Sequence, residues 1–538
     1  MNTGSPSLGA SARKAGLTKT PRCSHYNNRA CKFCSEVDAL EGRIHQAQLL
    51  LSDLFEAHRD LMSLDNDVHD PMRNLPPEVV SLVFVFCTTA GHPANREYDE
   101  NTRRKVQPPL LLGAVCRRWR EVAWSTPALW TRICVVIRSV NPHCQVGTAE
   151  RWLSRSGQLP LSIHIRFPAG DILDPPSPRP HPIIPLLNRY SSRWAELDID
   201  VVSFGLLRHL FGDLIEGASI LKTLSIGRRA TYARPTAAFS IRNFTPSPHV
   251  VKIYSISFRL IGISWANVTH VELGMIFIDE SYQLFRLAPQ LMNCWFNLVD
   301  EGAGGFGMPD DIVVLQHLQR LKLSEFYSKP LVEPFFAQLG CPSLTSLEWG
   351  GVYDVSSLPP FLARSSCPLT FIDLSGVGGT EEELINLFYG TPFVTTLKLC
   401  FVPAGDAFLE LLASTVFSSV DSEDESTFLP NLRRLEFRND KHFSWSSVPP
   451  IFRLEPPSPD SIRRPLESLS LDKYFELNWD PIIDFIDEET LSEILRIRER
   501  GVELIMIAYG FGGVDIVKAS LEHHREQKRK RLLKKTAP

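Results

Sequence analysis

A six-residue apolar pattern recurs through the second half of this chain and constrains its fold more than any other feature. Apolar residues occupy the first, fourth and sixth places of each unit. Successive side chains of a strand point to opposite faces, so the fourth and sixth residues share one face while the residue between them points the other way. The pattern therefore predicts short strands that each bury one face.

Ten such units follow one another, and most of their starts are separated by 23 to 27 residues. The longer steps are expected to hold inserts or one unrecognised unit. Helical patterns lie between units, for example at Leu358–Arg364 and Glu381–Tyr389. The ten units are Trp194/Leu197/Ile199, Leu221/Leu224/Ile226, Val268/Val271/Leu273, Leu291/Cys294/Phe296, Leu318/Leu321/Leu323, Leu344/Leu347/Trp349, Leu369/Ile372/Leu374, Val394/Leu397/Leu399, Leu432/Leu435/Phe437 and Leu466/Leu469/Leu471.

This spacing resembles that of leucine-rich repeat proteins, whose repeats span ~20–29 residues. The resemblance covers residues 190–475 and implies an α/β fold in which stacked units form an irregular solenoid. It is irregular because the ninth place, where those families favour Asn or Cys, holds Val352, Val377 and Val402 in the three clearest units. Other groups must then form the hydrogen bonds of the turn after each strand. An ordinary α/β domain is the alternative.

A second pattern lies nearer the amino terminus. The segment 75–87 opens with two prolines where a helix loses least from a missing N–H, and Glu78 lies in the first turn. Val79, Leu82 and Phe86 then recur at helical spacing.

The segment Ala114–Trp130 continues this pattern. Val115, Trp119, Val122 and Ala123 share a face, with arginines mostly on the other side. Another part of the chain or a partner must cover these apolar faces.

Together the two segments resemble an F-box, the helical module that joins a substrate receptor to a ubiquitin ligase. The resemblance depends on Leu75/Pro76, Glu78, Phe84, Val115/Cys116/Arg117, Trp119 and Leu129/Trp130. The polar link at residues 88–109 is longer than usual, which loop entropy tolerates. The alternative is that these helices begin one large core. The resemblance implies that a surface for the Skp adaptor is formed or supported by Leu75, Pro76, Glu78, Val79, Leu82, Phe84, Val115, Cys116 and Trp119.

A helix that precedes the F-box segment carries apolar residues at steps of three and four. They run from Val37 to Leu61, with His58 as the one polar residue among them. This pattern predicts a helix that pairs with another helix or lies along the body of the protein. Packing beside the F-box is slightly favoured over self-association as a coiled coil through residues 37–66.

The chain is expected to contain seven regions. They are a disordered leader at 1–36, the amphipathic helix at 37–66, the F-box at 72–135, a connector at 136–193, the repeat region at 194–475, a cap at 476–520 and a basic tail at 521–538. Proline-rich segments at 168–185 and 447–465 are expected to exclude helices and central strands, and an acidic insert lies at Asp421–Ser426.

Charge and cysteine content narrow the partners and the compartment. With 57 Lys and Arg against 61 Asp and Glu, the net charge of −4 offers no global attraction for nucleic acid. The 11 cysteines lack framework spacing, and no signal peptide or membrane span is found. We expect reduced thiols, a cytoplasmic or nuclear location, and neither membrane nor nucleic acid as a partner. The basic run Lys528–Lys535 is equally compatible with a nuclear-import signal and with a solvated helix end.

Two motifs suggest that the protein binds a ligand, but for each motif an explanation without a ligand is favoured. Cys23, His25, Cys31 and Cys34 could chelate zinc, yet their spacing is wrong for a usual finger, so loose thiols and no bound metal are favoured.

The second motif is glycine-rich: Gly302, Gly304 and Gly307 match a dinucleotide fingerprint and precede a helical pattern at Asp310–Leu318. The neighbouring carboxylates would repel a pyrophosphate. We therefore expect no cofactor.

The common hydrolase, zinc-protease and phosphate-binding motifs are missing from the sequence. The sequence thus predicts a non-catalytic, substrate-recruiting subunit of a Skp–cullin–F-box ubiquitin ligase. Alternatives are a repeat scaffold without ubiquitin transfer and a ligand-sensing F-box receptor. The target protein would contact the exposed mid-strand residues Lys322, Glu348, Asp373, Lys398 and Glu436, although an ordinary solvated face is an equal alternative.

Overall fold

The computed structural model describes residues 32–69, 71–89, 108–137, 142–166, 181–199, 210, 220–227, 239–240, 245–254, 256–301, 306–414, 428–439, 443–452, 464–474, 485–509 and 513–535. The chain divides into two compact units, Met1–Leu129 and Trp130–Pro538. The predicted F-box region, 72–135, therefore extends slightly into the second unit.

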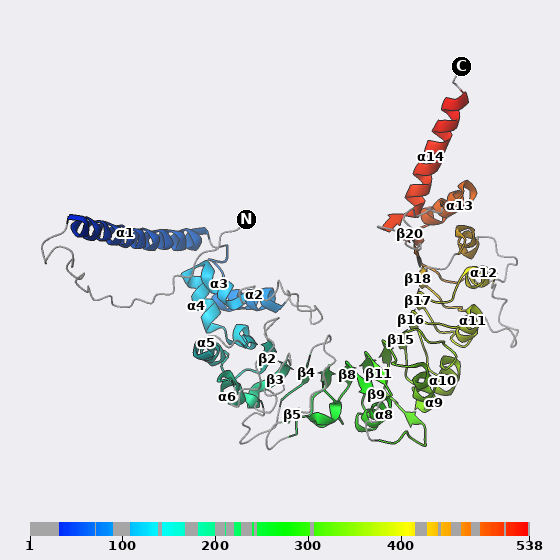
Figure 1. Ribbon diagram of the computed structural model, residues 1–538, viewed down its shortest axis with the longest axis horizontal. Helices are drawn as coiled ribbons and strands as arrows, with labels where there is room; N and C mark the ends of the chain where they lie inside the picture. Colours follow the sequence, from blue (N-terminus) through cyan, green and yellow to red (C-terminus); the bar gives the residue numbers. More distant parts are fainter. Residues whose placement is uncertain are drawn as a thin grey trace. The chain divides into compact units, whose positions relative to one another are not determined.

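The described residues of the first unit are mostly helical (Figure 1). Helix α1 spans Lys32–His69, and it begins inside the predicted leader. The link expected at 88–109 is shorter than predicted at both ends, because helices extend into it. Three further helices follow: α2 (Pro77–Thr89), α3 (Pro108–Val115) and α4 (Arg117–Ser125).

A break at Cys116 separates α3 from α4. Its backbone is extended (φ −149°, ψ 175°), and its thiol caps α4 by accepting a hydrogen bond from the amide of Trp119 at 3.5 Å. The sequence predicted that Val115 shares a face with Val122 and Ala123. Because the helix is interrupted, Val115 is exposed while Val122 and Ala123 are buried.

The second unit is built on one large sheet. Each strand pairs in parallel with the next main-sheet strand along the chain, except that the last strand pairs in antiparallel fashion. In the described part of the chain its strands are β1 (Arg132–Val136), β2 (Leu161–Arg166), β3 (Trp194–Ile199), β4 (Thr223–Ile226), β6 (Val250–Ile253), β8 (His270–Leu273), β10 (Asn293–Phe296), β13 (Arg320–Leu323), β15 (Ser346–Gly350), β16 (Phe371–Ser375), β17 (Thr396–Cys400), β18 (Arg434–Asn439), β19 (Ser468–Tyr474), β20 (Glu503–Tyr509) and β21 (Gly513–Asp515).

Small two-stranded pairs flank this sheet. They are β5 (Phe239–Ser240) with β7 (Ile261–Gly262), β9 (Ile276–Phe277) with β11 (Val299–Asp300), and β12 (Val313–Val314) with β14 (Leu339–Gly340).

Helices connect many of the strands, and Figure 1 shows α9 to α12 in a row beside β15 to β18. The helices are α5 (Pro142–Arg155), α6 (Ile183–Asn188), α8 (Ile278–Leu287), α9 (Val332–Ala337), α10 (Leu358–Ser365), α11 (Glu381–Tyr389), α12 (Asp406–Ser414), α13 (Glu488–Glu499) and α14 (Ile516–Lys535). Short 3-10 helices lie at Pro127–Trp130, Ser191–Arg193, Phe258–Leu260, Lys329–Leu331, Trp445–Ser447 and Pro449–Phe452. The helices expected at 358–364 and 381–389 are therefore confirmed.

One apolar residue from each parallel strand lies in register with the next, and none of these side chains is more than 5% exposed. The stack is the centre of the core. It consists of Ile133, Ile163, Leu197, Leu224, Val251, Val271, Cys294, Leu321, Leu347, Ile372, Leu397, Leu435, Leu469 and Leu504.

Each of the ten predicted units contains a strand of this sheet, so the mixed α/β class is confirmed. The long step between the second and third units holds β6, the unrecognised unit. The sheet also extends beyond the predicted repeat region, because β1, β2 and β20 lie outside residues 194–475. Strand β2 has Pro160 at the first place of the unit, which hid it from the pattern, whereas Trp130, Ile133 and Val135 at β1 fit the pattern but were assigned to the F-box.

The turns after β15, β16 and β17 are satisfied by backbone hydrogen bonds. Each places one residue in the left-handed region, namely Gly351, Gly376 and Phe401, with φ of 128°, 70° and 53°. The amides of these residues donate to the carbonyls of Ser375, Cys400 and Arg438 in the next strand, at 3.0, 2.7 and 2.8 Å.

The valines at the ninth place behave differently from one another. Val377 and Val402 are buried, whereas Val352 is 76% exposed.

Two predictions about proline-rich segments were wrong. Helix α6 begins at Ile183, within 168–185, and a 3-10 helix covers Pro449–Phe452, within 447–465. Prolines are tolerated there because they lie in the first turn, where a backbone N–H has no partner inside the helix. The acidic insert at 421–426 lies outside the described residues.

The eight cysteines whose side chains the structure describes all carry free thiols. Across the described ranges, no helix is both long and apolar enough to cross a membrane. Most of the predicted basic tail belongs to helix α14.

Candidate functional site

The apolar residues of α2 divide into a buried set and an exposed set at helical spacing. Val80 and Phe84 are 2% and 1% exposed, so they face the interior of the first unit. Leu82 and Phe86, by contrast, are 59% and 71% exposed. The helix starts at the proline pair, where the amide of Val79 donates to the carbonyl of Pro76 at 3.0 Å.

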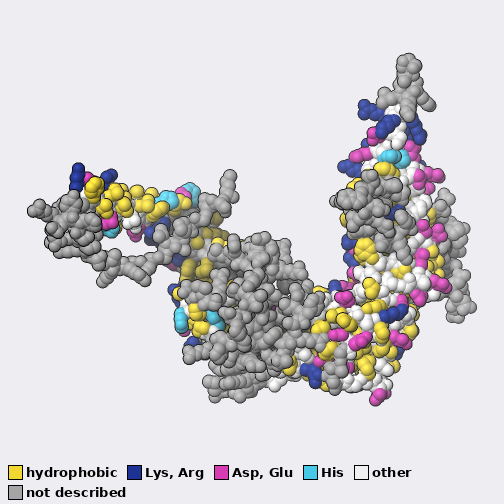
Figure 2. Space-filling model, viewed as in Figure 1, with side chains coloured by type: hydrophobic (Ala, Val, Ile, Leu, Met, Phe, Trp, Pro, Cys, Tyr) yellow, Lys and Arg dark blue, Asp and Glu magenta, His cyan; other side chains and the backbone are white. Residues whose placement is uncertain are grey.

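Helix α3 adds further exposed apolar residues, and Figure 2 shows hydrophobic side chains over α3 and α4. We call the exposed apolar residues of α2, α3 and the preceding turn the α2–α3 face. Its members are Leu75, Val79, Leu82, Phe86, Leu110, Leu111 and Val115.

Helix α4 supports this face from behind. The Trp119 ring packs on Phe84 with centroids 4.9 Å apart. The Arg118 guanidinium donates to the carbonyl of Leu75 at 2.7 Å, and that of Arg120 donates to the carbonyl of Gly113 at 2.7 Å. These arginines therefore fix the starts and ends of neighbouring helices.

The structure separates the predicted adaptor residues into surface and support. Phe84 and Cys116 are buried and Trp119 is partly buried, so these three support the fold. The exposed members are Leu75, Pro76, Glu78, Val79, Leu82 and Val115.

Sequence reasoning left Phe86, Leu110 and Leu111 out of the site. The helical spacing of Phe86 from Leu82 could have included it, whereas Leu110 and Leu111 gave no such signal because α3 is short and begins at the edge of the polar link.

A second candidate surface lies on the opposite face of the large sheet from the buried stack. One residue from each parallel strand again lies in register, and we call this set the mid-strand row. It consists of Cys134, His164, Asp198, Ser225, Lys252, Glu272, Trp295, Lys322, Glu348, Asp373, Lys398, Glu436, Ser470 and Ile505.

The five predicted target-binding residues are consecutive members of this row. Lys322 lies 2.6 Å from Glu348, and Lys398 lies 2.7 Å from Glu436. Four of the five charges are therefore already paired within the protein. Lys322 also lies 4.8 Å from the centre of the Trp295 ring, an aromatic contact that the sequence did not predict.

Asp373 lies between these two pairs. Its carboxylate accepts a hydrogen bond from the Ser375 hydroxyl at 3.2 Å, and no ion pair to it is found among the described residues. Burial raises the pKa of this carboxyl, and the nearby charge of Glu348 raises it further, against the opposing effects of Ser375 and Lys398. Asp373 is thus a carboxylate kept on a partly exposed face at an electrostatic cost.

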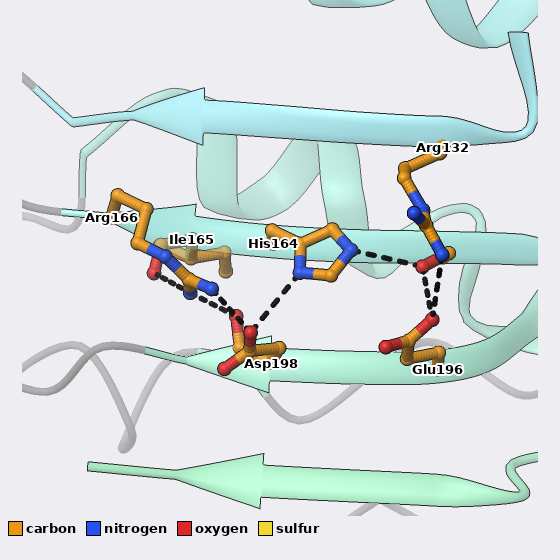
Figure 3. Close-up of polar contacts among 7 residues, drawn as sticks. Arg132, His164, Ile165, Arg166, Glu196 and Asp198 are labelled. Carbon is orange, nitrogen blue, oxygen red and sulfur yellow. Dashed lines mark hydrogen bonds and ion pairs between the residues drawn. The ribbon is translucent and has the colours of Figure 1, made fainter. Parts of the chain in front are cut away.

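The amino-terminal end of the row carries a polar network that sequence reasoning missed (Figure 3). The Nε2 atom of His164 lies 3.0 Å from the Ser162 hydroxyl, and its Nδ1 atom lies 3.1 Å from Asp198. Glu196 accepts the Ser162 hydroxyl, while Arg166 binds Asp198.

These contacts follow the serine, histidine and aspartate order of a catalytic triad, but the hydrogen bonds run differently. In a triad the histidine accepts the serine proton. Here the Ser162 hydroxyl donates to Glu196 instead of to the imidazole. The Ser162 amide is also occupied, because it donates to the carbonyl of Thr131 at 2.9 Å. The network links β2 and β3.

The charge of Asp198 is strongly favoured in this network. Burial alone would raise its pKa, but the hydrogen bond from His164 and the charge and hydrogen bond of Arg166 outweigh burial and hold the pKa far below the ordinary range.

The glycine-rich motif does not lead into a helix. Gly302 and Gly304 lie outside the described residues, and β12 occupies part of the segment that was expected to be helical, 310–318. The carboxylate of Asp279 accepts the amide of Phe306 at 2.9 Å, beside the motif. A dinucleotide site needs a helix amino terminus for the pyrophosphate, and this segment provides none.

Of the four predicted zinc ligands, Cys23, His25 and Cys31 lie outside the described residues. Cys34 belongs to α1, but the position of its side chain is not described. No group of three candidate metal ligands occurs within the described ranges.

Fold and site together define a mixed α/β protein with a helical amino-terminal unit, an exposed apolar helix face and a long sheet of sequentially ordered parallel strands. No protein-family model matches the chain, and no curated protein matches it.

Proposed function

We propose that this protein is the substrate-recruiting subunit of a Skp–cullin–F-box ubiquitin ligase. Helices α2 to α4 form the F-box that docks on the Skp adaptor, and the sheet unit is a leucine-rich-repeat-like solenoid that binds the target protein. The subunit recruits without performing catalysis itself, and it acts in the cytoplasm or the nucleus.

The exposed α2–α3 face is the observation that carries this proposal. Leu82 and Phe86 project from a helix whose other side is anchored by Phe84, so they cannot turn inward without unpacking the unit. Exposed apolar clusters of this kind are typical of interaction sites. A few such anchors supply most of the binding energy of an interface.

The order of the sheet supports the repeat assignment. Each strand from β1 to β20 pairs only with its neighbours in the main-sheet order, and the buried stack runs through all of them. This is the arrangement expected when repeated units bury a continuous core.

For the target, we propose that Asp373 is the primary contact in the mid-strand row. Its neighbours Glu348 and Lys398 are engaged by other residues, so Asp373 is available to a lysine or arginine of the target. Such a group would offset the cost of keeping this carboxylate charged.

Co-purification with a Skp adaptor tests the docking proposal. The double substitution Leu82→Ala and Phe86→Ala should weaken adaptor binding by about 100-fold or more, since each removes an anchor. The matched control is Val352→Ala with Phe393→Ala, which removes two similarly exposed side chains from the sheet unit. Binding that is equal in both double variants, with both folded by circular dichroism, would refute the assignment.

A scaffold without ubiquitin transfer is a second candidate, because α1 presents a long exposed apolar stripe that suits self-association. Purification from cells followed by mass spectrometry separates the two. A ligase receptor brings the adaptor and a cullin with it, and a scaffold brings neither.

A further inference from the structure

Helix α1 is exposed on every side. It is 38 residues long, and each of its described side chains is exposed except that of Ser63. The sequence favoured packing of this helix beside the F-box; α1 does contact α4, but its described large apolar side chains remain exposed. The polar contact that joins it to α4 is an ion pair between Arg117 and Asp60 at 3.2 Å, with both side chains about two-thirds exposed.

The exposed apolar residues of α1 follow a heptad repeat, in which positions a and d form the contact line of a coiled coil. Figure 2 shows hydrophobic side chains along the helix, among charged ones. The stripe is about 50 Å long at the 1.5 Å rise of an α-helix. Position a holds Val37, Ile44, Leu51, His58 and Asp65, and position d holds Phe33, Leu40, Ala47, Leu54, Leu61 and Val68.

The flanking positions select the orientation of a partner helix. In a parallel pair, each g residue faces the e residue of the next heptad on the other helix. In α1 this brings Leu50 against Phe55, and Ala57 against Met62. Both of these contacts are apolar on both sides, whereas the corresponding pairs nearer the start of the helix are Glu36 with Glu41 and Arg43 with Gln48. An antiparallel pair would instead set e residues against each other, placing Gln48 beside Phe55.

The sequence of α1 therefore complements a second copy of itself. The other long described helix, α14, offers no comparable stripe, since its one exposed large apolar residue in the described part is Leu532. His58 lies within the apolar line, and a shift by one heptad would place it against Leu51. A polar residue at an a position fixes register in this way at some cost in stability.

From this geometry we propose that α1 pairs with α1 of a second copy of the chain in a parallel, in-register coiled coil. The protein is then a dimer through its amino-terminal helix, and two copies of the sheet unit are carried on one assembly. This inference does not depend on the ligase proposal, because it uses no residue of the α2–α3 face.

Sedimentation equilibrium of the full chain tests the dimer. The chain has a mass of 60.7 kDa, so the expected species has about twice that mass. Leu51→Asp places a charge at an a position in both copies and should weaken dimerisation by at least about 100-fold. The matched control is Leu49→Asp, because Leu49 is as exposed as Leu51 (55% against 54%) but lies at the outer f position. Dimerisation of the control should be unchanged.

The orientation is tested by Ala47→Cys, at a d position. Mild oxidation should link residue 47 to residue 47 of the second copy, as mapped by mass spectrometry, while Leu49→Cys should give no link. A link formed only when Ala47→Cys is combined with His58→Cys would show an antiparallel pair and overturn the parallel assignment. A monomer at tens of micromolar, or a dimer that Leu51→Asp leaves intact, would overturn the proposal as a whole. Thermal unfolding of the sheet unit should be the same in all variants, which excludes misfolding as the cause.

Discussion

The ring of Phe84 lies against the ring of Trp119, with centroids 4.9 Å apart and planes inclined by 51°. Phe84 belongs to α2 and Trp119 to α4, so this contact joins two helices of the first unit. It also sets the rotation of α2 about its axis. With Phe84 turned inward, Leu82 and Phe86 must point outward.

Phe84→Ala should therefore unfold or loosen α2. Removing a fully buried phenylalanine side chain costs about 3–5 kcal/mol, which is a large fraction of the stability of a small helical unit. Urea unfolding followed by circular dichroism would measure the loss. The companion variant Phe86→Ala, on the exposed side of the same helix, should change stability by less than about 0.5 kcal/mol. Equal losses in the two variants would contradict the observed rotation of α2.

Gly113→Ala should destabilise the first unit through a steric clash. A Cβ atom at this position would lie 1.9 Å from the ring of Trp124, which no real contact allows. Overpacking of this kind costs about 1–3 kcal/mol. Gly147→Ala in α5 is the control, because its Cβ would meet nothing within 4 Å. That change should stabilise the protein by about 0.5–1 kcal/mol through helix propensity. A neutral Gly113→Ala, measured by urea unfolding, would show that the helices can separate.

Asp198→Asn should destabilise the sheet unit at neutral pH, by on the order of 2 kcal/mol, because Arg166 and His164 lose a charged partner. The pKa of Asp198 is lowered in the folded protein, so its stabilising contribution is complete above about pH 4, the ordinary value. It is lost as the pH falls towards the folded pKa. The difference in unfolding free energy between wild type and variant should shrink below pH 4. A difference that grows with acid would contradict this sign.

Asp373→Asn should behave in the opposite way. The pKa of Asp373 is raised, chiefly by burial, so the charged carboxylate destabilises the folded state at neutral pH. Asparagine keeps an oxygen for the Ser375 hydroxyl and should raise the unfolding free energy by up to about 1 kcal/mol. This gain should fall as the pH drops through the folded pKa towards about 4. Denaturant titrations from pH 4 to 8 measure it, and a loss of stability at neutral pH would refute the prediction.

The buried stack could be predicted from the sequence because it depends on local spacing. Leu397 and Leu399 lie two residues apart in one strand, and the same spacing repeats in each unit. Alternation in a strand is a property of the backbone, so a few residues are enough to reveal it. Strand β6 escaped the pattern because Val251 and Ile253 hold the fourth and sixth places but Pro248 holds the first.

The polar network could not be predicted in the same way. Ser162 and Glu196 are separated by 34 residues, and their contact exists because β2 and β3 pair in a particular register. That register includes a shift between Leu161 and Ser162, which no local pattern encodes. The exposure of Phe86 was likewise undetermined, because helical spacing identifies a face but not what covers it.

Each main-sheet strand is hydrogen-bonded only to its immediate neighbours in this sheet. A local loss of stability can therefore spread along the sheet only from one strand to the next. A lesion near β4 would weaken the adjoining strands first and reach β19 only through every strand between them. A whole strand with its connecting segment could therefore be gained or lost in evolution, because the two strands that become neighbours would still present parallel edges able to pair.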